Sequence, residues 1–170
     1  MKILRSTFLL LLCFLVLPFN MLNTAAASSL LQYPLFNLNN NHAQSLDASA
    51  TGKILLINFF AADCVWCERQ FKALNLLQQH CGASVSIAVV GVGAGSINNF
   101  RNKLKSHQIT LPAYIADKKF LAAIGDVPFT PYSLIFNEHS EYLEKINGYM
   151  DAEKLQRLLM QYQPALNCKI

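Results

Sequence analysis

The chain has 170 residues, of which 53% are hydrophobic, so it can bury the core of one domain but is too short for two domains of ordinary size. Only 14% of the residues are charged, which excludes an intrinsically disordered chain and a salt-rich coiled coil. A formal net charge of +4 is too weak to indicate a nucleic-acid-binding protein. The five cysteines can be interpreted only once the compartment is known, because paired thiols have different roles in oxidising and reducing surroundings.

The first residues have the pattern of an export signal. Lys2 and Arg5 precede an unbroken apolar run from Phe8 to Leu17, and Ala25 to Ala27 offers the small residues that a signal peptidase accepts. We therefore expect a cleaved signal peptide over residues 1–27 and export to the periplasm. An uncleaved anchor facing the periplasm is the alternative, although the apolar run is much shorter than the roughly 20 residues that span a membrane.

Cleavage would also remove the first cysteine. Leu12 precedes Cys13, whereas a lipid-attachment cysteine in bacteria normally follows a small residue, so lipidation is not expected. The single domain expected over residues 28–170 then keeps the other cysteines, which are Cys64, Cys67, Cys81 and Cys168. In an oxidising compartment these thiols are able to form disulfides.

Apolar patterning predicts alternating strands and helices along this domain. Residues 33–50 are typical of a short strand followed by a turn. The continuous apolar run from Lys53 to Phe60 predicts a central strand that is buried on both faces, and Val65 to Gln79 then has the spacing of a helix. Val85 to Val92 predicts a second buried strand, followed by a helix from Ser96 to His107.

The second half of the domain adds shorter elements. An extended piece near Ala113 to Ala116 and a helical turn over Lys118 to Ile124 precede a hairpin with strands Tyr132 to Asn137 and Tyr142 to Asn147. A last helix is expected over Asp151 to Tyr162, with the aspartate as its cap. This order predicts an α/β fold with a central mixed β-sheet flanked by helices on both faces.

One motif carries most of the expected chemistry. Cys64-Val65-Trp66-Cys67 stands where a buried strand ends and a helix begins, so its sulfurs lie within disulfide reach and the free amide groups of the first helical turn stabilise a thiolate. Thiols in such positions have pKa values lowered from about 8.5 to between about 3.5 and 7.5. We expect Cys64 to be the exposed nucleophile and Cys67 to resolve the mixed disulfide.

The same spacing also occurs in half of a zinc site and in inert disulfides. A zinc ribbon needs a second pair at similar spacing, which Cys81 and Cys168 do not provide, so we expect no metal. The histidines are scattered over loops and helix ends, and none is expected to be a ligand.

A proline at the start of the hairpin is a second candidate feature. Proline at the beginning of an apolar strand needs a reason, and one reason is a cis peptide bond between Thr130 and Pro131 that exposes backbone groups to an extended substrate. An edge or turn proline is the alternative. From the residues alone, Pro128 competes with Pro131 for this role.

Together these features resemble the thioredoxin superfamily, and within it the exported TlpA/ResA-like thiol-disulfide oxidoreductases. The resemblance covers roughly Tyr33 to Tyr162 and rests on Asn58 to Cys67, the Asp117 region, Thr130 to Phe136 and Gly148. It implies a thioredoxin-like fold with an N-terminal strand extension. It also implies that the dithiol acts without a bound cofactor.

The resemblance assigns further site residues. It implies that Pro131, rather than Pro128, is the cis proline beside the redox pair, and that a substrate groove surrounds Cys64, Trp66 and Thr130. The implied partners are exported proteins that contain cysteines, together with a membrane reductant of the DsbD kind.

Three positions depart from the family pattern. Asn58 stands where thioredoxins carry a buried aspartate, and Gln70 stands where ResA-type members often have a glutamate. Glu68 and Glu144 remain as candidate carboxylates, although solvated surface charges are the simpler interpretation. Asp63 stands where the family often has tryptophan, and its charge would oppose formation of a thiolate on the next residue.

The remaining cysteines are placed by the implied topology. In this fold the helix after Cys67 and the last helix lie on one sheet face and run away from the active end, which would bring Cys81 and Cys168 together. A second, structural disulfide is one hypothesis and two unpaired thiols are the other. If it forms without strain, the long loop that it closes would stabilise the domain by a few kcal/mol.

The resulting expectation is a periplasmic thiol-disulfide oxidoreductase. No histidine lies between the paired cysteines to stabilise the thiolate, which favours a reductase or isomerase over a strong oxidant. The alternative is a non-catalytic thioredoxin-like binding module such as a copper chaperone.

Overall fold

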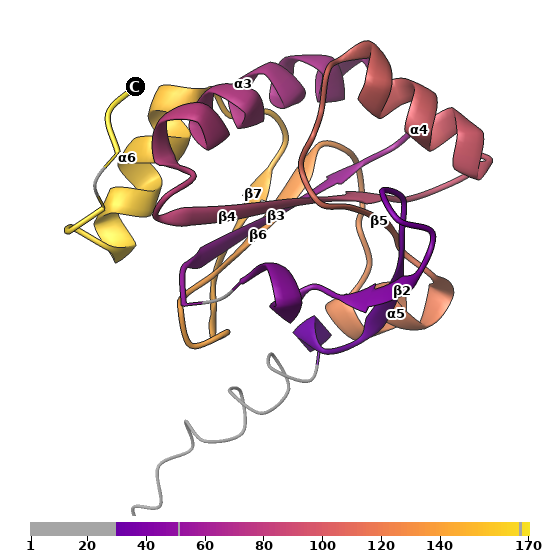
Figure 1. Cartoon of the computed structure of the whole chain (residues 1–170), viewed down its shortest axis with the longest axis horizontal. Helices are drawn as coiled ribbons and strands as arrows, with labels where there is room; N and C mark the ends of the chain where they lie inside the picture. The colour runs from indigo at the N-terminus through magenta and orange to yellow at the C-terminus, as the bar shows by residue number, and fades with distance from the viewer. Residues whose placement is uncertain (1–29, 51, 167) are drawn as a thin grey trace, which may run out of the picture.

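The computed structural model describes residues 30–170 except for residues 51 and 167 (Figure 1). The expected signal peptide over residues 1–27 and Cys13 lie outside the described residues. In the part of the chain that is described, no helix combines the length and the hydropathy that crossing a membrane requires.

A mixed sheet of seven strands runs through the domain. The strands are β1 (Pro34–Asn37), β2 (Ala43–Ser45), β3 (Ile54–Phe60), β4 (Val85–Gly91), β5 (Ala113–Ile115), β6 (Tyr132–Phe136) and β7 (Tyr142–Asn147). Their order across the sheet is β2-β1-β5-β4-β3-β6-β7. Strands β3, β4 and β5 are mutually parallel, and every other neighbouring pair is antiparallel.

The central strand β3 explains why the sheet is covered on both faces. All seven of its residues are buried, with β4 on one side and β6 on the other. Because successive side chains of a strand point to opposite faces, Leu56 and Phe60 enter one core, whereas Leu55 and Ile57 enter the other. A mostly apolar run therefore suits this position.

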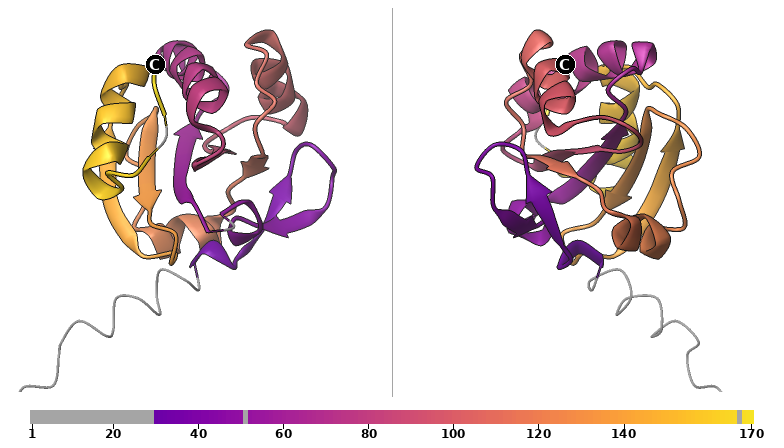
Figure 2. Two further views of the ribbon diagram at one scale, coloured as in Figure 1. Left: turned by 60° about the vertical axis from the view of Figure 1, so that its left-hand side comes forward. Right: turned by 90° about the vertical axis from the view of Figure 1, so that its right-hand side faces the viewer.

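The helices divide unequally between the two faces. They are α3 (Val65–Cys81), α4 (Ile97–Ser106), α5 (Lys118–Ile124) and α6 (Ala152–Tyr162), with a short 3-10 helix η1 (Asp47–Ser49). Helices α3, α4 and α6 cover the face that holds Leu56, whereas α5 and the N-terminal segment lie on the opposite face (Figures 1 and 2). The predicted α/β fold with helices on both faces is confirmed.

The N-terminal extension is a hairpin at the sheet edge. Strand β1 pairs antiparallel with β5, as a strand extension requires, but it also pairs with β2, which the polar sequence did not predict. Asn37 stabilises the turn, because its side-chain oxygen accepts hydrogen bonds from the backbone of Asn39 and Asn40. The other strands and helices lie within about two residues of their predicted bounds.

Candidate active site

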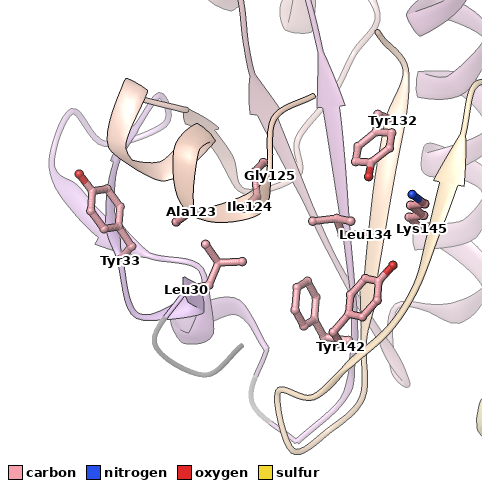
Figure 3. Close-up of a pocket in the computed structure, with 10 residues that line it drawn as sticks. Leu30, Tyr33, Ala123, Ile124, Gly125, Tyr132, Leu134, Tyr142 and Lys145 are labelled. Carbon is pink, nitrogen blue, oxygen red and sulfur yellow. The ribbon is translucent and has the colours of Figure 1, made fainter. Parts of the chain in front are cut away.

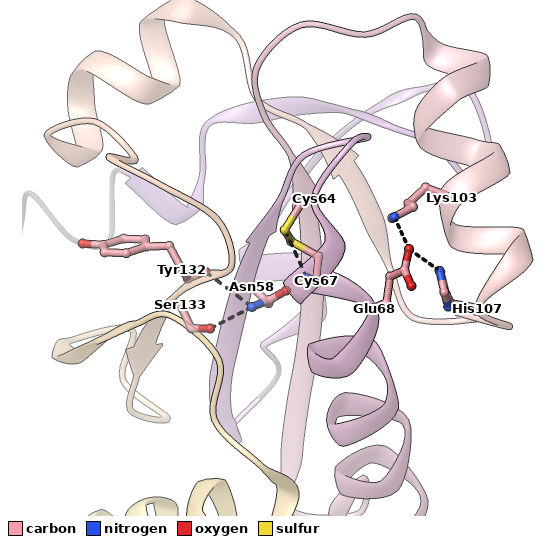
Figure 4. Close-up of a disulfide and its surroundings, with 8 residues drawn as sticks. All are labelled: Asn58, Cys64, Cys67, Glu68, Lys103, His107, Tyr132 and Ser133. Carbon is pink, nitrogen blue, oxygen red and sulfur yellow. Dashed lines mark hydrogen bonds and ion pairs between the residues drawn. A yellow bond between two sulfur atoms is a disulfide. The ribbon is translucent and has the colours of Figure 1, made fainter.

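The paired cysteines lie at the start of α3. Cys64 is the N-cap of this helix and Cys67 is in its first turn, and the two form a disulfide with 5.3 Å between their Cα atoms (Figure 4). The Cys64 Sγ also accepts a hydrogen bond of 3.1 Å from the backbone N–H of Cys67. A sulfur in this position faces the unpaired amide groups of the helix, which stabilise negative charge.

The two sulfurs differ in exposure. Cys67 is completely buried against the core, whereas Cys64 is only partly buried. The side chains between them face solvent, with Val65 73% and Trp66 55% exposed. Cys64 is therefore the more accessible of the two cysteines.

An aromatic pair joins α3 to the loop before α6. The Trp66 ring lies 6.5 Å, between ring centroids, from the ring of Tyr149, and the Arg69 guanidinium lies 4.6 Å from the centre of the indole. Tyr149 is itself 41% exposed. These side chains form a partly apolar rim beside Cys64, and sequence analysis had found only Trp66 among them.

The hairpin strand β6 starts at the same end of the sheet. Phe59 pairs with Tyr132 in the antiparallel register of β3 and β6, so the segment before Tyr132 lies beside the segment that leads into Cys64. The peptide bond between Thr130 and Pro131 is cis, and among the described residues it is the one cis bond. The Pro131 carbonyl accepts a hydrogen bond from the Gly148 N–H at 3.0 Å, which ties this turn to the end of β7.

Asn58 provides a polar group beneath the disulfide. Its side chain is fully buried on β3 and donates a hydrogen bond of 2.9 Å to the Ser133 hydroxyl. Figure 4 shows the other end of the amide turned toward Cys67, and its oxygen has no hydrogen-bond partner. Unlike an aspartate, this amide carries no charge and does not titrate.

Gln70 lies one turn further along α3. Its side-chain oxygen accepts a hydrogen bond of 2.9 Å from the Met150 N–H, while its buried nitrogen has no partner. The contact fixes the loop that carries Tyr149 against the helix that carries the cysteines. In this chain Gln70 therefore positions the rim of the site.

The two candidate carboxylates are engaged elsewhere. Glu68 binds the Lys103 ammonium at 2.8 Å, which holds the pKa of its carboxyl below the usual range. Glu144 accepts a hydrogen bond from the Tyr162 hydroxyl at 2.6 Å. In Figure 4 the Glu68 side chain points toward Lys103 and His107, away from the disulfide. Both carboxylates are thus paired with groups other than the two sulfurs, as their interpretation as surface charges predicts.

The other two cysteines meet at the far end of α3. Cys81, the last residue of the helix, is joined to Cys168 in a second disulfide with 4.6 Å between the Cα atoms. Both are buried, with exposed fractions of 0% and 9%. Across the described residues, no group of three or more His, Cys, Asp and Glu side chains is arranged to hold a metal ion.

No protein family model matches the sequence, and no curated protein matches it either. Solved structures do match the fold. A secreted Mycobacterium tuberculosis disulfide oxidoreductase homologous to Escherichia coli DsbE has a TM-score of 0.65 at 16% identity, over 78% of this chain and 98% of its own. StoA from Bacillus subtilis has a TM-score of 0.62 at 18% identity, over 75% of this chain and 95% of its own.

A third match is a DsbF homologue from Corynebacterium diphtheriae. Its TM-score is 0.65 at 20% identity, over 75% of this chain and 85% of its own. The chain has the thioredoxin-like fold. This result confirms the fold that the sequence resemblance implied.

Proposed function

We propose that this protein is a thiol-disulfide oxidoreductase that exchanges disulfides with exported proteins in the periplasm. One observation carries the proposal: a partly exposed Cys64 sulfur caps α3 and is bonded to the fully buried Cys67. Such an arrangement offers one sulfur to a partner and keeps the second within reach. The thioredoxin-like fold shared with disulfide oxidoreductases supports the same conclusion.

The reaction needs only the two thiols of the reduced pair. The Cys64 thiolate attacks one sulfur of a substrate disulfide, which forms a mixed disulfide and releases the other substrate sulfur as a thiolate. Cys67, once deprotonated, then attacks the Cys64 sulfur, which breaks the mixed disulfide and releases the second substrate sulfur. Two electrons have passed to the substrate, and the Cys64–Cys67 disulfide remains.

Two features of the site act on the first step in opposite directions. The N-terminus of the 17-residue helix α3 stabilises the Cys64 thiolate, and the N–H of Cys67 already points at its sulfur. The exposed carboxylate of Asp63 precedes Cys64 and opposes the same charge. Neither of the two side chains between the cysteines carries a positive charge. This balance supports a reductase or an isomerase in preference to a strong oxidant.

The rim of the site suits a polypeptide substrate. Trp66 and Phe129 present exposed aromatic surface, and Thr130 and Pro131 connect Phe129 to β6 along the chain. We propose that this rim forms the substrate groove, with backbone groups near the cis peptide bond as hydrogen-bond partners. A reductase working in this way must be re-reduced, and a membrane reductant of the DsbD kind would supply the electrons.

Turnover tests the proposal. In a glutathione-coupled insulin reduction assay the protein should reduce insulin catalytically, and Cys64→Ser should abolish turnover. Cys67→Ser is the matched variant, because it keeps the attacking thiol and should accumulate a mixed disulfide visible by mass spectrometry. Absence of turnover together with stoichiometric copper binding would instead establish the copper-chaperone alternative.

The reduction potential of the Cys64–Cys67 pair then decides the direction of electron transfer. A value near about −270 mV is typical of thioredoxin, whereas about −120 mV is typical of DsbA. We expect a value closer to the first, measured by equilibration of the Cys64–Cys67 pair with glutathione. A value near the second would contradict the reductase and isomerase assignment while leaving disulfide exchange intact.

A further inference from the structure

A pocket opens on the sheet face opposite to α3. It has a volume of about 530 Å³, within the range of roughly 300–1,000 Å³ typical of small-molecule sites. Strands β6 and β7 form one wall, the end of α5 forms another, and the N-terminal segment at Leu30 and Tyr33 closes the third side (Figure 3). The steps proposed above for disulfide exchange do not use this pocket.

The pairing of β6 with β7 explains which of their side chains face the pocket. Leu134 lies opposite Lys145 and Phe136 lies opposite Tyr142 in the register of β6 and β7, so these side chains share one face of the sheet. On the other face of β7, Glu144 bonds to Tyr162 of α6. The side of the hairpin that faces the pocket keeps Tyr142 49% exposed.

The polar groups of the pocket gather along the hairpin. Figure 3 shows the hydroxyls of Tyr132 and Tyr142 and the amine of Lys145 on the same side. None of these three groups has a hydrogen-bond or ion-pair partner among the described residues. The phenols and the ammonium are all hydrogen-bond donors, and the ammonium carries a full positive charge.

The acidic groups nearby are already committed. Asp117 accepts hydrogen bonds from the Tyr33 hydroxyl and from the Phe120 N–H, and Asp126 accepts one from the Val127 N–H. Glu144 points to the opposite face. Lys145 is therefore an unpaired cation at the edge of an apolar cavity.

The opposite part of the pocket is apolar. Leu30, Ala123 and Ile124 line it, together with Leu134 from the hairpin. A ligand that fills the pocket must bury hydrocarbon against these side chains and present hydrogen-bond acceptors to the donors on β6 and β7. A negative head group satisfies Lys145 best, because charge-assisted hydrogen bonds are about twice as strong as neutral ones.

We propose that this pocket binds an amphiphile with one anionic head and an unbranched hydrocarbon tail, such as an alkyl carboxylate. The head contacts Lys145 and the two tyrosine hydroxyls, and the tail lies along Leu134 and Ile124 toward Leu30. No bond is made or broken. The ligand is held by burial of its tail and by charge complementarity at its head.

Calorimetry on the full chain with dodecanoate, below its micellar concentration, tests this proposal. We expect one site per chain and an affinity that falls about threefold to fourfold for each methylene removed in the series to decanoate and octanoate. Lys145→Gln should weaken dodecanoate binding at least about tenfold and leave dodecanol binding within about twofold. Lys105→Gln is the matched control, because it removes an exposed lysine of α4 on the other side of the sheet, and it should change neither affinity.

A second variant tests the cavity itself. Ala123→Phe adds a ring at the end of α5 and should weaken dodecanoate and dodecanol alike, while far-UV circular dichroism verifies the fold. The Cys64→Ser variant should bind as the unaltered chain does, which separates this proposal from the proposed function. Absence of binding, as expected if residues before Leu30 or a second copy fill the pocket, would overturn the proposal. An equal response of both ligands to Lys145→Gln would do the same.

Discussion

The two ends of α3 carry the same kind of bond in opposite surroundings. At its start Cys64 is partly exposed, bonds to Cys67 three residues away, and is flanked by the exposed Trp66. At its end Cys81 is fully buried and bonds to Cys168, 87 residues along the chain. One helix thus separates a bond that a partner can reach from a bond that the core encloses.

Their positions on the helix give the two disulfides different chemical surroundings. Amide groups at the start of a helix stabilise a thiolate, whereas carbonyl groups at its end do not. The short ring closed by Cys64 and Cys67 restricts the unfolded chain very little, but the long loop closed by Cys81 and Cys168 restricts it strongly. The first pair therefore suits exchange, and the second suits stability.

Removing the buried pair should have the largest effect on stability. The double variant Cys81→Ser, Cys168→Ser should lower the free energy of unfolding by about 2–5 kcal/mol, toward the upper end because the loop is long. Urea denaturation followed by circular dichroism measures this change. Insulin reduction at a temperature where the variant is folded should stay within about twofold, since neither serine lies near Cys64.

Alkylation of the oxidised protein without reductant is the control for that experiment. Mass spectrometry should then find no label on Cys81 or Cys168. After mild reduction, the alkylating reagent should label Cys64 first, because its sulfur is the accessible one. Label on the buried pair before any reduction would contradict the structural role of the second disulfide.

The Asn58→Asp variant tests the comparison at the other end of α3, where Cys64 and Cys67 lie. The introduced carboxyl would be fully buried, so its pKa in the folded protein is raised above that of the unfolded chain. Its contribution to stability is therefore greatest below the unfolded pKa of about 3.9 and is lost as the pH rises through the folded pKa. At neutral pH we expect a loss of about 1–3 kcal/mol, the typical cost of a buried polar group without full hydrogen bonding.

The pH profile distinguishes this effect from ordinary damage. Urea denaturation at several pH values should show stability of the Asn58→Asp variant falling as the pH rises from 4 to 8 relative to the unaltered protein. Asn58→Ala removes the same hydrogen bond to Ser133 but adds no titrating group, so its loss should not depend on pH. Parallel profiles for the two variants would mean that the Asn58 site does not desolvate a carboxyl.

Local sequence predicts most of the strands and helices because the spacing of apolar residues along the chain is clear. The mostly apolar run of β3 and the motif from Cys64 to Cys67 can each be recognised from its own segment of sequence. Both lie where they were expected. Strand β2 was not predicted because it is short and mostly polar. Its three residues, Ala43 to Ser45, are held by backbone pairing to β1.

Contacts between segments that are distant in the sequence could not be predicted from local sequence patterns. The ring of Tyr149 beside Trp66 and the bond from Met150 to Gln70 join positions about 80 residues apart, and nothing near either residue signals its partner. The choice between Pro128 and Pro131 was likewise open from the residues alone, because tertiary context selects the isomer of a prolyl bond. The resemblance to thioredoxins supplied the answer that the residues could not.

Glu68→Gln should have the smallest effect. Glu68 lies in the first turn of α3, where its hydrogen bond and charge interaction with Lys103 lower the pKa of its carboxyl. Such a group contributes stability above its unfolded pKa, and that contribution is lost as the pH falls through the lower folded pKa. Thermal melts should therefore show a small loss at neutral pH that disappears in acid, with insulin reduction within about twofold. A large loss of turnover would instead assign Glu68 to proton transfer at the Cys64 and Cys67 sulfurs. The disulfide at the start of α3 would then depend on a carboxylate, whereas the buried disulfide at the end of the helix would not.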